Sequence, residues 1–345
     1  MKKLLALILC TTLLFSMTAC NSEKPGNKDE QKDAKLTELK KITISEPVRG
    51  ILWAPVHLAK ELGYFEEQGL DVDIVTVQGD APTAPVLSGD AQFGLFGPEM
   101  ILGFNEKGQG TKLLITATKK FPYTFLSNSK YDSIESLKGT AINGADSGSS
   151  PRQFVRSVLK SGGLNPDADA NYVRIPNSGI IAAFENNDIA ATYASPESRQ
   201  LLLDSGAKML VDMYKPEVHN QILGSKDYEM YITFAKDDYI KENPEIVQKY
   251  VNAVYKATLW LNAHTVEEVT EAIRPSFSDN KNLEQTIKEI KDNGIFSETG
   301  GFTDSGFKAI NKMAKEAGII KNDVKKEQAV DESFIKKAQE SIKLD

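Results

Sequence analysis

The chain has 345 residues, of which 41% are hydrophobic and 26% are charged, a composition that is typical of globular proteins and excludes a disordered or fibrous one. Its formal net charge is −7, so we expect no binding to nucleic acid, whose phosphates repel an acidic surface. The three histidines, His57, His219 and His264, are too far apart in sequence to predict a zinc site. We therefore expect neither a metal nor a cofactor.

The first 20 residues have the pattern of a lipoprotein leader. Lys2 and Lys3 precede an apolar run at 4–14, which is too short to span a bilayer but has the length of a signal-peptide core. Residues 17–20, Met-Thr-Ala-Cys, resemble the lipobox of bacterial lipoproteins. We expect residues 1–19 to be a signal peptide and the lipidated Cys20 to hold the protein on the outer face of the membrane. An ordinary secretory signal with a chance cysteine is the alternative.

Residues 20–40 are polar and predict a flexible tether, after which one order of elements is predicted twice. In the first unit, strands near 41–45, 72–77 and 91–96 alternate with helices at 54–62 and 84–87. In the second, strands at 140–143, 172–175 and 189–193 alternate with helices at 151–160 and 180–184. Residues 90–99 align without a gap on residues 188–197, and both segments begin with Asp and end with Pro-Glu. The sequence therefore predicts a duplication and an α/β fold with two doubly wound lobes.

From residue 243 onward the pattern is helical, with helices predicted from 244 to about 261 and at 265–273, 282–292, 304–316 and 331–342. Helices with one apolar stripe need a surface to pack on, so this block should cover one lobe. We expect the chain to cross between the lobes near Phe125 and Tyr231, with a strand at 229–234 that returns to the first lobe. Lobe I would then hold residues 41–124 and 232–345, and lobe II residues 125–231.

Residues 63–72 (Gly-Tyr-Phe-Glu-Glu-Gln-Gly-Leu-Asp-Val) and 87–94 (Leu-Ser-Gly-Asp-Ala-Gln-Phe-Gly) resemble the nitrate, sulfonate and taurine family of substrate-binding proteins. Residues 136–139, Ser-Leu-Lys-Gly, match the second lobe of that family. The resemblance covers roughly residues 42–270 and implies a type II periplasmic-binding-protein-like fold with a hinge. It also implies an extracytoplasmic receptor, which we expect to be a monomer, that passes a small organic solute to the permease of an ABC transporter.

Besides a surface adhesin that merely displays an α/β domain, two other functions stay open at this stage. A relative of the same shape binds the pyrimidine precursor of thiamine, so a receptor for a heteroaromatic precursor is one of them. An enzyme related to the yeast-type thiamine pyrimidine synthase is the other, but the cysteine-rich iron motif of that enzyme is absent because only Cys20 would survive cleavage. We expect no catalytic activity.

Ligands of open α/β sheets bind outside the carboxyl ends of the strands, so the loops after the predicted strands should form the cleft. The loop at 144–150, Gly-Ala-Asp-Ser-Gly-Ser-Ser, enters a helix and offers hydroxyls and backbone N–H groups to an anion or a polar headgroup. Ser147 and Ser149 are expected ligand contacts. Ser150 is either a contact or a helix cap, because Pro151 and Gln153 complete a capping box.

Aromatic and charged side chains in the other loops leave the ligand class open. The rings of Trp53, Phe121 and Tyr193 would cover the body of a ligand, unless they only pack within the lobes. The two repeated strands end in equivalent loops that supply a backbone contact at Gly97 and the carboxylates of Glu99 and Glu197, which would suit amino groups, unless these carboxylates cap helices. A sulfonate, taurine or nitrate would instead pair with arginines near the cleft, namely Arg49, Arg152 and Arg199. We favour the sulfonate-type ligand on the strength of the Gly/Ser loop.

Overall fold

The computed structural model describes residues 38–77 and 82–344, apart from the side chain of residue 177. The predicted signal peptide, Cys20 and nearly all of the predicted tether lie outside the described residues. Among the helices of these described ranges, none is long and apolar enough to cross a membrane.

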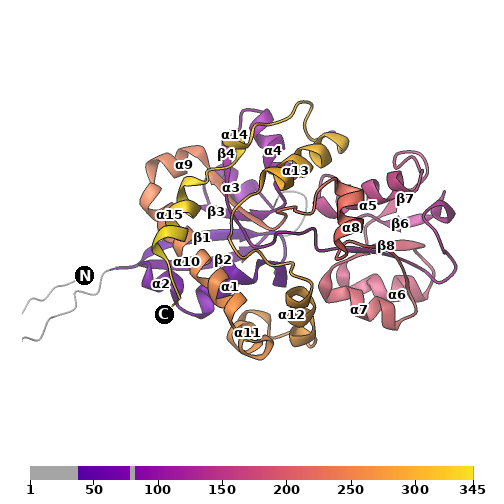
Figure 1. Cartoon of the computed structure of the whole chain (residues 1–345), viewed down its shortest axis with the longest axis horizontal. Coiled ribbons are helices and arrows are strands. Elements are labelled where there is room, and N and C mark those ends of the chain that lie inside the picture. Colours follow the sequence, from indigo (N-terminus) through magenta and orange to yellow (C-terminus); the bar gives the residue numbers. More distant parts are fainter. Residues whose placement is uncertain (1–37, 78–81, 345) are drawn as a thin grey trace, which may run out of the picture. The chain divides into compact units, whose positions relative to one another are not determined.

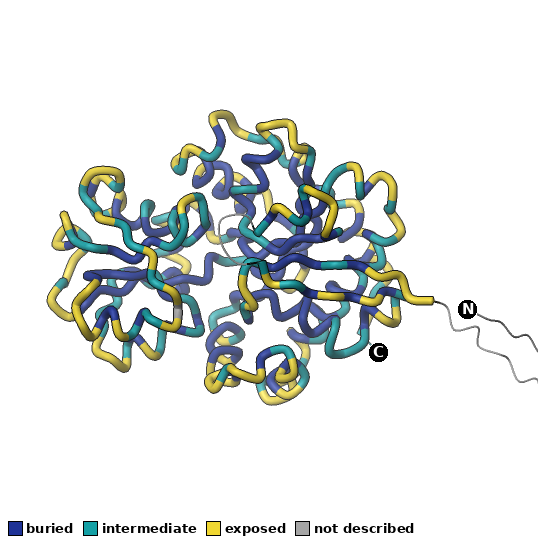
Figure 2. The backbone as a smooth tube through the Cα atoms, turned by 180° about the vertical axis from the view of Figure 1, so that it is seen from behind, coloured by how far each residue is buried: buried dark blue, intermediate teal, exposed yellow. Residues whose placement is uncertain are grey.

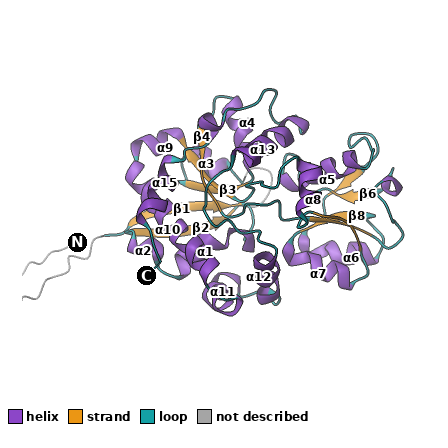
Figure 3. Ribbon diagram, in the orientation of Figure 1, coloured by secondary structure: helices purple, strands orange, loops and turns teal. Residues whose placement is uncertain are grey.

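The strands form two sheets of five. The first sheet contains β1 Lys40–Glu46, β2 Leu70–Thr76, β3 Phe93–Phe96, β4 Thr111–Thr116 and β10 Ile232–Lys236. The second contains β5 Thr124–Ser127, β6 Ala141–Asn143, β7 Asn171–Val173, β8 Ala191–Ala194 and β9 Lys208–Asp212. Figure 3 shows both sheets with helices on their faces. We call the parts of the chain built on these sheets lobe I and lobe II.

Helices alternate with the strands in both lobes and then follow one another at the C-terminal end (Figure 1). Lobe I contains α1 Ala54–Glu61, α2 Tyr64–Glu67, α3 Ala84–Ser88 and α4 Pro98–Glu106. Lobe II contains α5 Ser150–Ser161, α6 Ile180–Glu185, α7 Pro196–Asp204 and α8 Pro216–Leu223. After β10 come α9 Asp237–Glu242, α10 Pro244–Ala263, α11 Val266–Ile273, α12 Leu283–Asp292, α13 Asp304–Glu316, α14 Lys326–Ala329 and α15 Ser333–Ser341. Short 3-10 helices lie at Ile51–Trp53, Glu135–Leu137, Asn177–Gly179 and Arg274–Phe277.

The duplication predicted from the sequence is confirmed by the strand order. The first sheet runs β2-β1-β3-β10-β4 and the second runs β7-β6-β8-β5-β9. In each sheet the first three strands are parallel and the fourth is antiparallel to its neighbours. β8 and α7 begin 98 residues after β3 and α4 (191 − 93 and 196 − 98). Pro98 and Pro196 each begin a helix, where the missing N–H leaves no hydrogen bond unmade.

The C-terminal helices pack on lobe I, as predicted, but α12 and α13 also pack on α5, α7 and α8 of lobe II. The apolar stripe of α10, which includes Val247, Val251 and Leu261, is buried, and α10 packs against α1, α2 and α15. Tyr250 of the same helix stacks on Phe93 of β3 with 3.9 Å between the ring centroids. Figure 2 shows that buried stretches of the backbone run through the interior of the described part of the chain, whereas exposed residues lie at its periphery.

Three strands were not predicted, and the start of another was predicted wrongly. β4 and β5 are almost continuously buried, so they lack the alternation of apolar and polar residues that identifies a half-buried strand; β9 was missed as well. The returning strand begins at Ile232 rather than at residue 229. Residues 229–231 belong instead to the segment that joins the two sheets.

The chain passes between the sheets in two segments, at 117–123 and 224–231, and a third segment packs beside them. The N–H of Ala117 donates to the carbonyl of Tyr231 at 2.8 Å, and the N–H of Tyr228 donates to that of Lys119 at 2.9 Å. Residues 295–297, between α12 and α13, pair with the first crossing segment through a bridge between Thr118 and Phe296. The C-terminal block therefore reinforces the junction that we propose as the hinge.

Candidate ligand-binding site

Loops at the carboxyl ends of the strands face one another across the two lobes. The N–H of Ile51, in the loop after β1, donates to Oε1 of Glu197 at the start of α7, at 3.3 Å. Ser150, at the start of α5, donates through Oγ to Oε2 of Glu99 in α4 at 2.5 Å. Both hydrogen bonds join lobe I to lobe II, so loops that we predicted to form the cleft lie against one another between the lobes.

The two glutamates occupy equivalent positions and make reciprocal contacts. Glu99 and Glu197 are the second residues of α4 and α7, which follow the third parallel strand of each sheet. Each carboxylate accepts a hydrogen bond from the start of the helical segment that follows an equivalent strand of the opposite lobe, β1 for Glu197 and β6 for Glu99. The repeat that aligned these residues in the sequence therefore places them as a related pair between the lobes.

The surroundings of the two carboxylates differ. Glu99 is 1% exposed, its Oε1 accepts from the hydroxyl of Tyr228 at 2.5 Å, and its burial raises its pKa. Glu197 is partly exposed, and neither a cation nor a second hydrogen-bond donor contacts it among the described residues. Its charge lies close enough to Tyr123 and Tyr231 to add to the effect of burial, which raises the pKa of both phenols.

A run of aromatic rings extends from lobe I to lobe II beside Glu197. Trp53 packs edge-on against Tyr231 with 4.6 Å between the centroids, and the hydroxyls of Tyr231 and Tyr123 lie 2.7 Å apart. Tyr123 in turn lies 5.4 Å from Tyr193 at the end of β8. The indole Nε1 of Trp53 is buried without a hydrogen-bond partner among the described residues. Burial raises the pKa of Tyr193 to about 12, so this phenol is neutral near pH 7.

The three serines of the predicted Gly/Ser loop differ, because one is exposed and the other two form hydrogen bonds within the protein. Ser147 is exposed and forms no hydrogen bond within the described chain. Ser149 is the N-cap of α5, accepting from the N–H of Arg152 at 3.4 Å and donating to the carbonyl of Asp146 at 2.7 Å. The capping box expected at Ser150 is wrong, because α5 begins one residue earlier and Pro151 takes its second position. The hydroxyl of Ser150 donates to Glu99 instead.

The three arginines near the cleft are already engaged. Nε of Arg49 lies 3.1 Å from Oε1 of Glu46. Arg152 donates to the carbonyl of Ala145 at 2.9 Å and lies over the ring of Tyr172 at 4.0 Å. Nη1 of Arg199 lies 3.2 Å from Oε1 of Glu289 in α12. An anionic ligand would have to compete with these contacts.

Phe121 and His219 belong to the junction between the lobes. Phe121 is fully buried against the rings of Tyr123, Phe154 and Tyr228. Its N–H donates to Nε2 of His219 at 3.0 Å, while Nδ1 of His219 lies 2.7 Å from the carbonyl of Ser225. Burial lowers the pKa of His219, so its neutral form, protonated on Nδ1, donates to Ser225 and accepts from Phe121. His219 thereby fastens the two crossing segments to each other.

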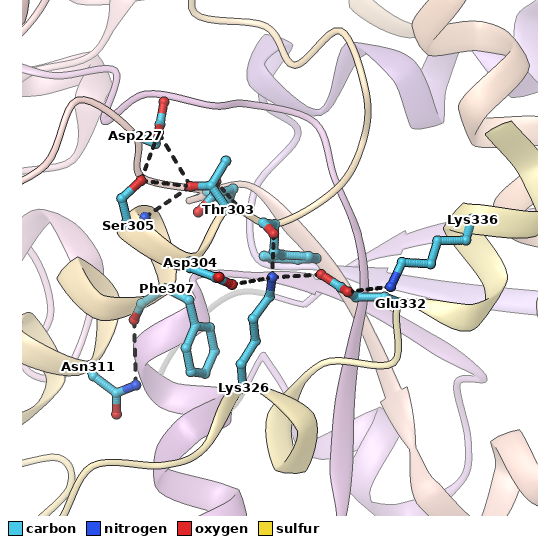
Figure 4. A network of polar contacts seen from close by, with 12 residues as sticks. Asp227, Thr303, Asp304, Ser305, Phe307, Asn311, Lys326, Glu332 and Lys336 are labelled. Carbon is cyan, nitrogen blue, oxygen red and sulfur yellow. Dashed lines mark hydrogen bonds and ion pairs between the residues drawn. The ribbon is translucent and has the colours of Figure 1, made fainter.

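The second crossing segment is also attached to α13 (Figure 4). Asp227 accepts from the hydroxyl of Ser305 at 3.0 Å. Oε1 of Glu229 accepts from both the N–H and the hydroxyl of Thr303, the N-cap of α13, at 3.0 Å each. Burial raises the pKa of Glu229 to about 7. Neither Glu229 nor Tyr228 was predicted as important; the Tyr-Glu-Met-Tyr sequence directly before the returning strand was the available signal.

Within the part of the chain that the structure describes, no group of three histidine, cysteine, aspartate or glutamate residues is arranged to hold a metal ion. His57 lies instead in the core of lobe I, with its Nε2 3.1 Å from Oε2 of the buried Glu46.

Comparison with known proteins identifies relatives over most of the chain. The protein named "Putative binding protein YtlA" of Bacillus subtilis (strain 168) is 23% identical over 333 residues, which cover 94% of each chain. The 4-amino-5-hydroxymethyl-2-methylpyrimidine phosphate synthase THI11 of Saccharomyces cerevisiae is 26% identical over 251 residues, 67% of this chain and 70% of its own.

A solved structure with the same fold is that of SsuA from Methylobacillus flagellatus KT, described as the periplasmic sulfonate-binding protein of a putative sulfonate ABC transporter. It superposes with a TM-score of 0.62 at 19% identity and covers 88% of this chain and 95% of its own. The two sheets with their helices are thus a two-lobed periplasmic-binding-protein-like fold, as predicted. The family model described as "NMT1/THI5 like" matches residues 52–268, well over half of the 345 residues. The chain belongs to the NMT1/THI5-like family.

Proposed function

We propose that the protein is an extracytoplasmic solute receptor that binds a small, flat, amine-bearing ring between its lobes and delivers it to the permease of an ABC importer. The observation that supports this ligand class best is the carboxylate of Glu197, which has no cationic partner among the described residues and lies beside a run of aromatic rings. A carboxylate attracts amino groups, and aromatic faces pack on a flat heterocycle. The names of relatives support the same class, since the yeast relative makes a pyrimidine phosphate.

The binding residues that we propose are Trp53, Tyr193 and Glu197. The unpartnered Nε1 of Trp53 would donate to a ring nitrogen or carbonyl of the solute, since a buried donor without a partner costs roughly 1–3 kcal/mol. Ser147 stays a proposed contact because its hydroxyl is unengaged within the described residues.

A sulfonate is the second candidate, supported by the fold shared with a sulfonate-binding protein and by Ser147 near the start of α5. A sulfonate would have to compete for the three arginines, because Arg49 and Arg199 already face carboxylates and Arg152 packs on Tyr172. This turns our preference away from the sulfonate that the sequence favoured. We also propose a role without catalysis, because the two cysteines of the chain, Cys10 and Cys20, are too few for the iron motif of the related synthase.

Calorimetric titration with 4-amino-5-hydroxymethyl-2-methylpyrimidine, taurine and nitrate tests the ligand class. The pyrimidine should bind to the wild type, and Glu197→Gln should weaken it roughly 10- to 150-fold, the loss expected for a charge-assisted hydrogen bond. Glu217→Gln is the matched control, because Pro216-Glu217 also begins a helix but Glu217 is exposed. Binding of taurine without the pyrimidine would reject our choice of ligand.

Membrane attachment through Cys20 is a separate part of the proposal. Cys20→Ala should release the exported protein from the membrane fraction, because no other anchor is predicted and no membrane-spanning helix occurs among the described residues. Fractionation of cells followed by immunoblotting measures this. A Cys20→Ala protein that stays with the membrane would contradict lipidation at this residue.

A further inference from the structure

Gly97 and Ser150 approach each other closely across the lobes. A Cβ atom added at Gly97 would lie 2.1 Å from Oγ of Ser150 and 3.0 Å from Oε2 of Glu99. The backbone of Gly97 is extended, with φ −84° and ψ 148°, a conformation that any residue adopts. The equivalent residue of the other lobe is Ser195, with φ −77° and ψ 167°. Glycine at position 97 is therefore explained by the room that Ser150 needs, not by the turn.

Glu99 accepts hydrogen bonds from two other parts of the molecule. Oε2 accepts from Ser150 of lobe II and Oε1 accepts from Tyr228 of the second crossing segment, both at 2.5 Å. The hydroxyl of Tyr228 also lies 3.2 Å from Sδ of Met313 in α13. All three hydrogen-bonding side chains are buried, so removing one donor leaves a buried carboxyl oxygen unsatisfied, which is costly in a low-dielectric interior.

We propose that Gly97, Glu99 and Ser150 form an interlobe latch that holds the two lobes together in the absence of solute. Each carboxyl oxygen of Glu99 has its donor from the protein itself, so the contact is complete without a ligand. Opening the cleft breaks the bond to Ser150, whereas Tyr228 can stay with Glu99. The latch sets how readily the empty receptor opens.

The equivalent residue Glu197 differs in each of these respects. It accepts a longer bond, 3.3 Å, from a backbone N–H, and it is partly exposed. Both carboxylates accept a bond from the opposite lobe, but Glu99 alone of the two is buried with a donor on each oxygen, so we assign the latch to Glu99 and solute binding to Glu197. The role of Glu197 rests on the proposed function, whereas the latch is defined without any solute.

Hydrogen–deuterium exchange on the ligand-free full chain tests the latch. Ser150→Ala and Gly97→Ala should each speed amide exchange about tenfold or more in peptides that cover both 97–102 and 149–154, which lie in opposite lobes. Alanine at 97 displaces the hydroxyl of Ser150 from Glu99, so both variants break the same bond. The double variant should then exchange as Ser150→Ala does alone, because effects that act through one contact are not additive.

Gly103→Ala is the matched control. Its Cβ would lie 2.7 Å from Cγ2 of Ile319 and within 4 Å of no atom of Ser150, so it should lower the melting temperature without faster exchange at 149–154. Ser150→Ala adds no atom and keeps the test available should Gly97→Ala fail to fold. Unchanged exchange at 149–154 in Ser150→Ala, or additive effects in the double variant, would overturn the latch. Failure of the pyrimidine titration with these results intact would reject only the proposed ligand.

Discussion

Glu229 lies in the second crossing segment with one oxygen bonded to Thr303 and the other, Oε2, buried without a hydrogen-bond partner in the described structure. Burial raises its pKa from 4.5 to about 7, and the nearby carboxylate of Asp227 adds to the shift. The folded state therefore holds this proton more tightly than the unfolded state does. The free energy of unfolding should fall as the pH rises from about 4.5 to about 7, and the loss should be complete above that range.

Glu229→Gln should remove this pH dependence. Since one pKa unit corresponds to about 1.4 kcal/mol, the difference in unfolding free energy between pH 5 and pH 8 should change by roughly 2–4 kcal/mol, with the wild type losing more stability at pH 8. Urea unfolding at the two pH values measures the difference. The exposed Glu242 provides a control, since Glu242→Gln should leave the pH dependence as in the wild type. An unchanged pH dependence in Glu229→Gln would show that this carboxyl does not titrate as described.

For single residues, the sequence predicted which positions of the two lobes are equivalent but not which side chains form hydrogen bonds with them. The repeat placed Glu99 and Glu197 at equivalent helix starts, which the structure confirms. It gave no sign that Ser150, 51 residues away, would donate to Glu99, because that contact crosses between lobes and follows no local pattern. The sequence suggested Ser150 as the helix cap, whereas the cap is Ser149. Both serines lie just before Pro151, and only the residue at which the helix begins decides which of them is the cap.

Helices α12 and α13 belong to the C-terminal block but pack on lobe II as well. α12 packs against α7, and α13 packs against α5 and α8. Each helix carries one ion pair to lobe II, Glu289 with Arg199 and Glu316 with Lys160. The first pair is largely buried, with side chains 20% and 7% exposed, whereas Lys160 of the second is 62% exposed.

Arg199→Ala should be more destabilising than Lys160→Ala. Burial raises the pKa of Glu289 and the charge of Arg199 opposes that effect, so removing the arginine leaves a buried carboxylate without its cation. We expect a loss of about 2–4 kcal/mol for Arg199→Ala and of less than about 1 kcal/mol for Lys160→Ala. Chemical denaturation at pH 7 compares them. Equal losses would mean that the burial of the first pair has no energetic consequence.

The elements that the sequence predicted well are those with a clear period. The stripe of α10 and the alternation in β2, where Leu70, Val72 and Ile74 are buried and the aspartates between them are exposed, were both recognisable. The pairing of 295–297 with the first crossing segment could not be predicted, because a segment of three residues that forms one β-bridge is too short to show a periodic pattern.

At the scale of the whole molecule, the duplication explains both the fold and the meeting of equivalent loops between the lobes. Two lobes with one strand order bring these loops together at the carboxyl ends of their parallel strands, so their proximity could be predicted from the sequence. The ligand class could not, because it depends on which charges are already paired. Arg49 and Arg199 are paired, whereas Glu197 has no cation beside it in the described residues, and only the tertiary contacts reveal this difference.

The antiparallel strand of the first sheet, β10, has a consequence for the order in which the chain folds. Strands β5 to β9 lie within residues 124–212 and can complete the second sheet as soon as that stretch has emerged. The first sheet cannot be completed, because β10 must insert between β3 and β4 and is synthesised long after both. The half of the molecule that emerges first is thus the last to finish folding. Until residue 232 arrives, β3 and β4 each present an unpaired edge, and this interval is when the chain is most exposed to aggregation.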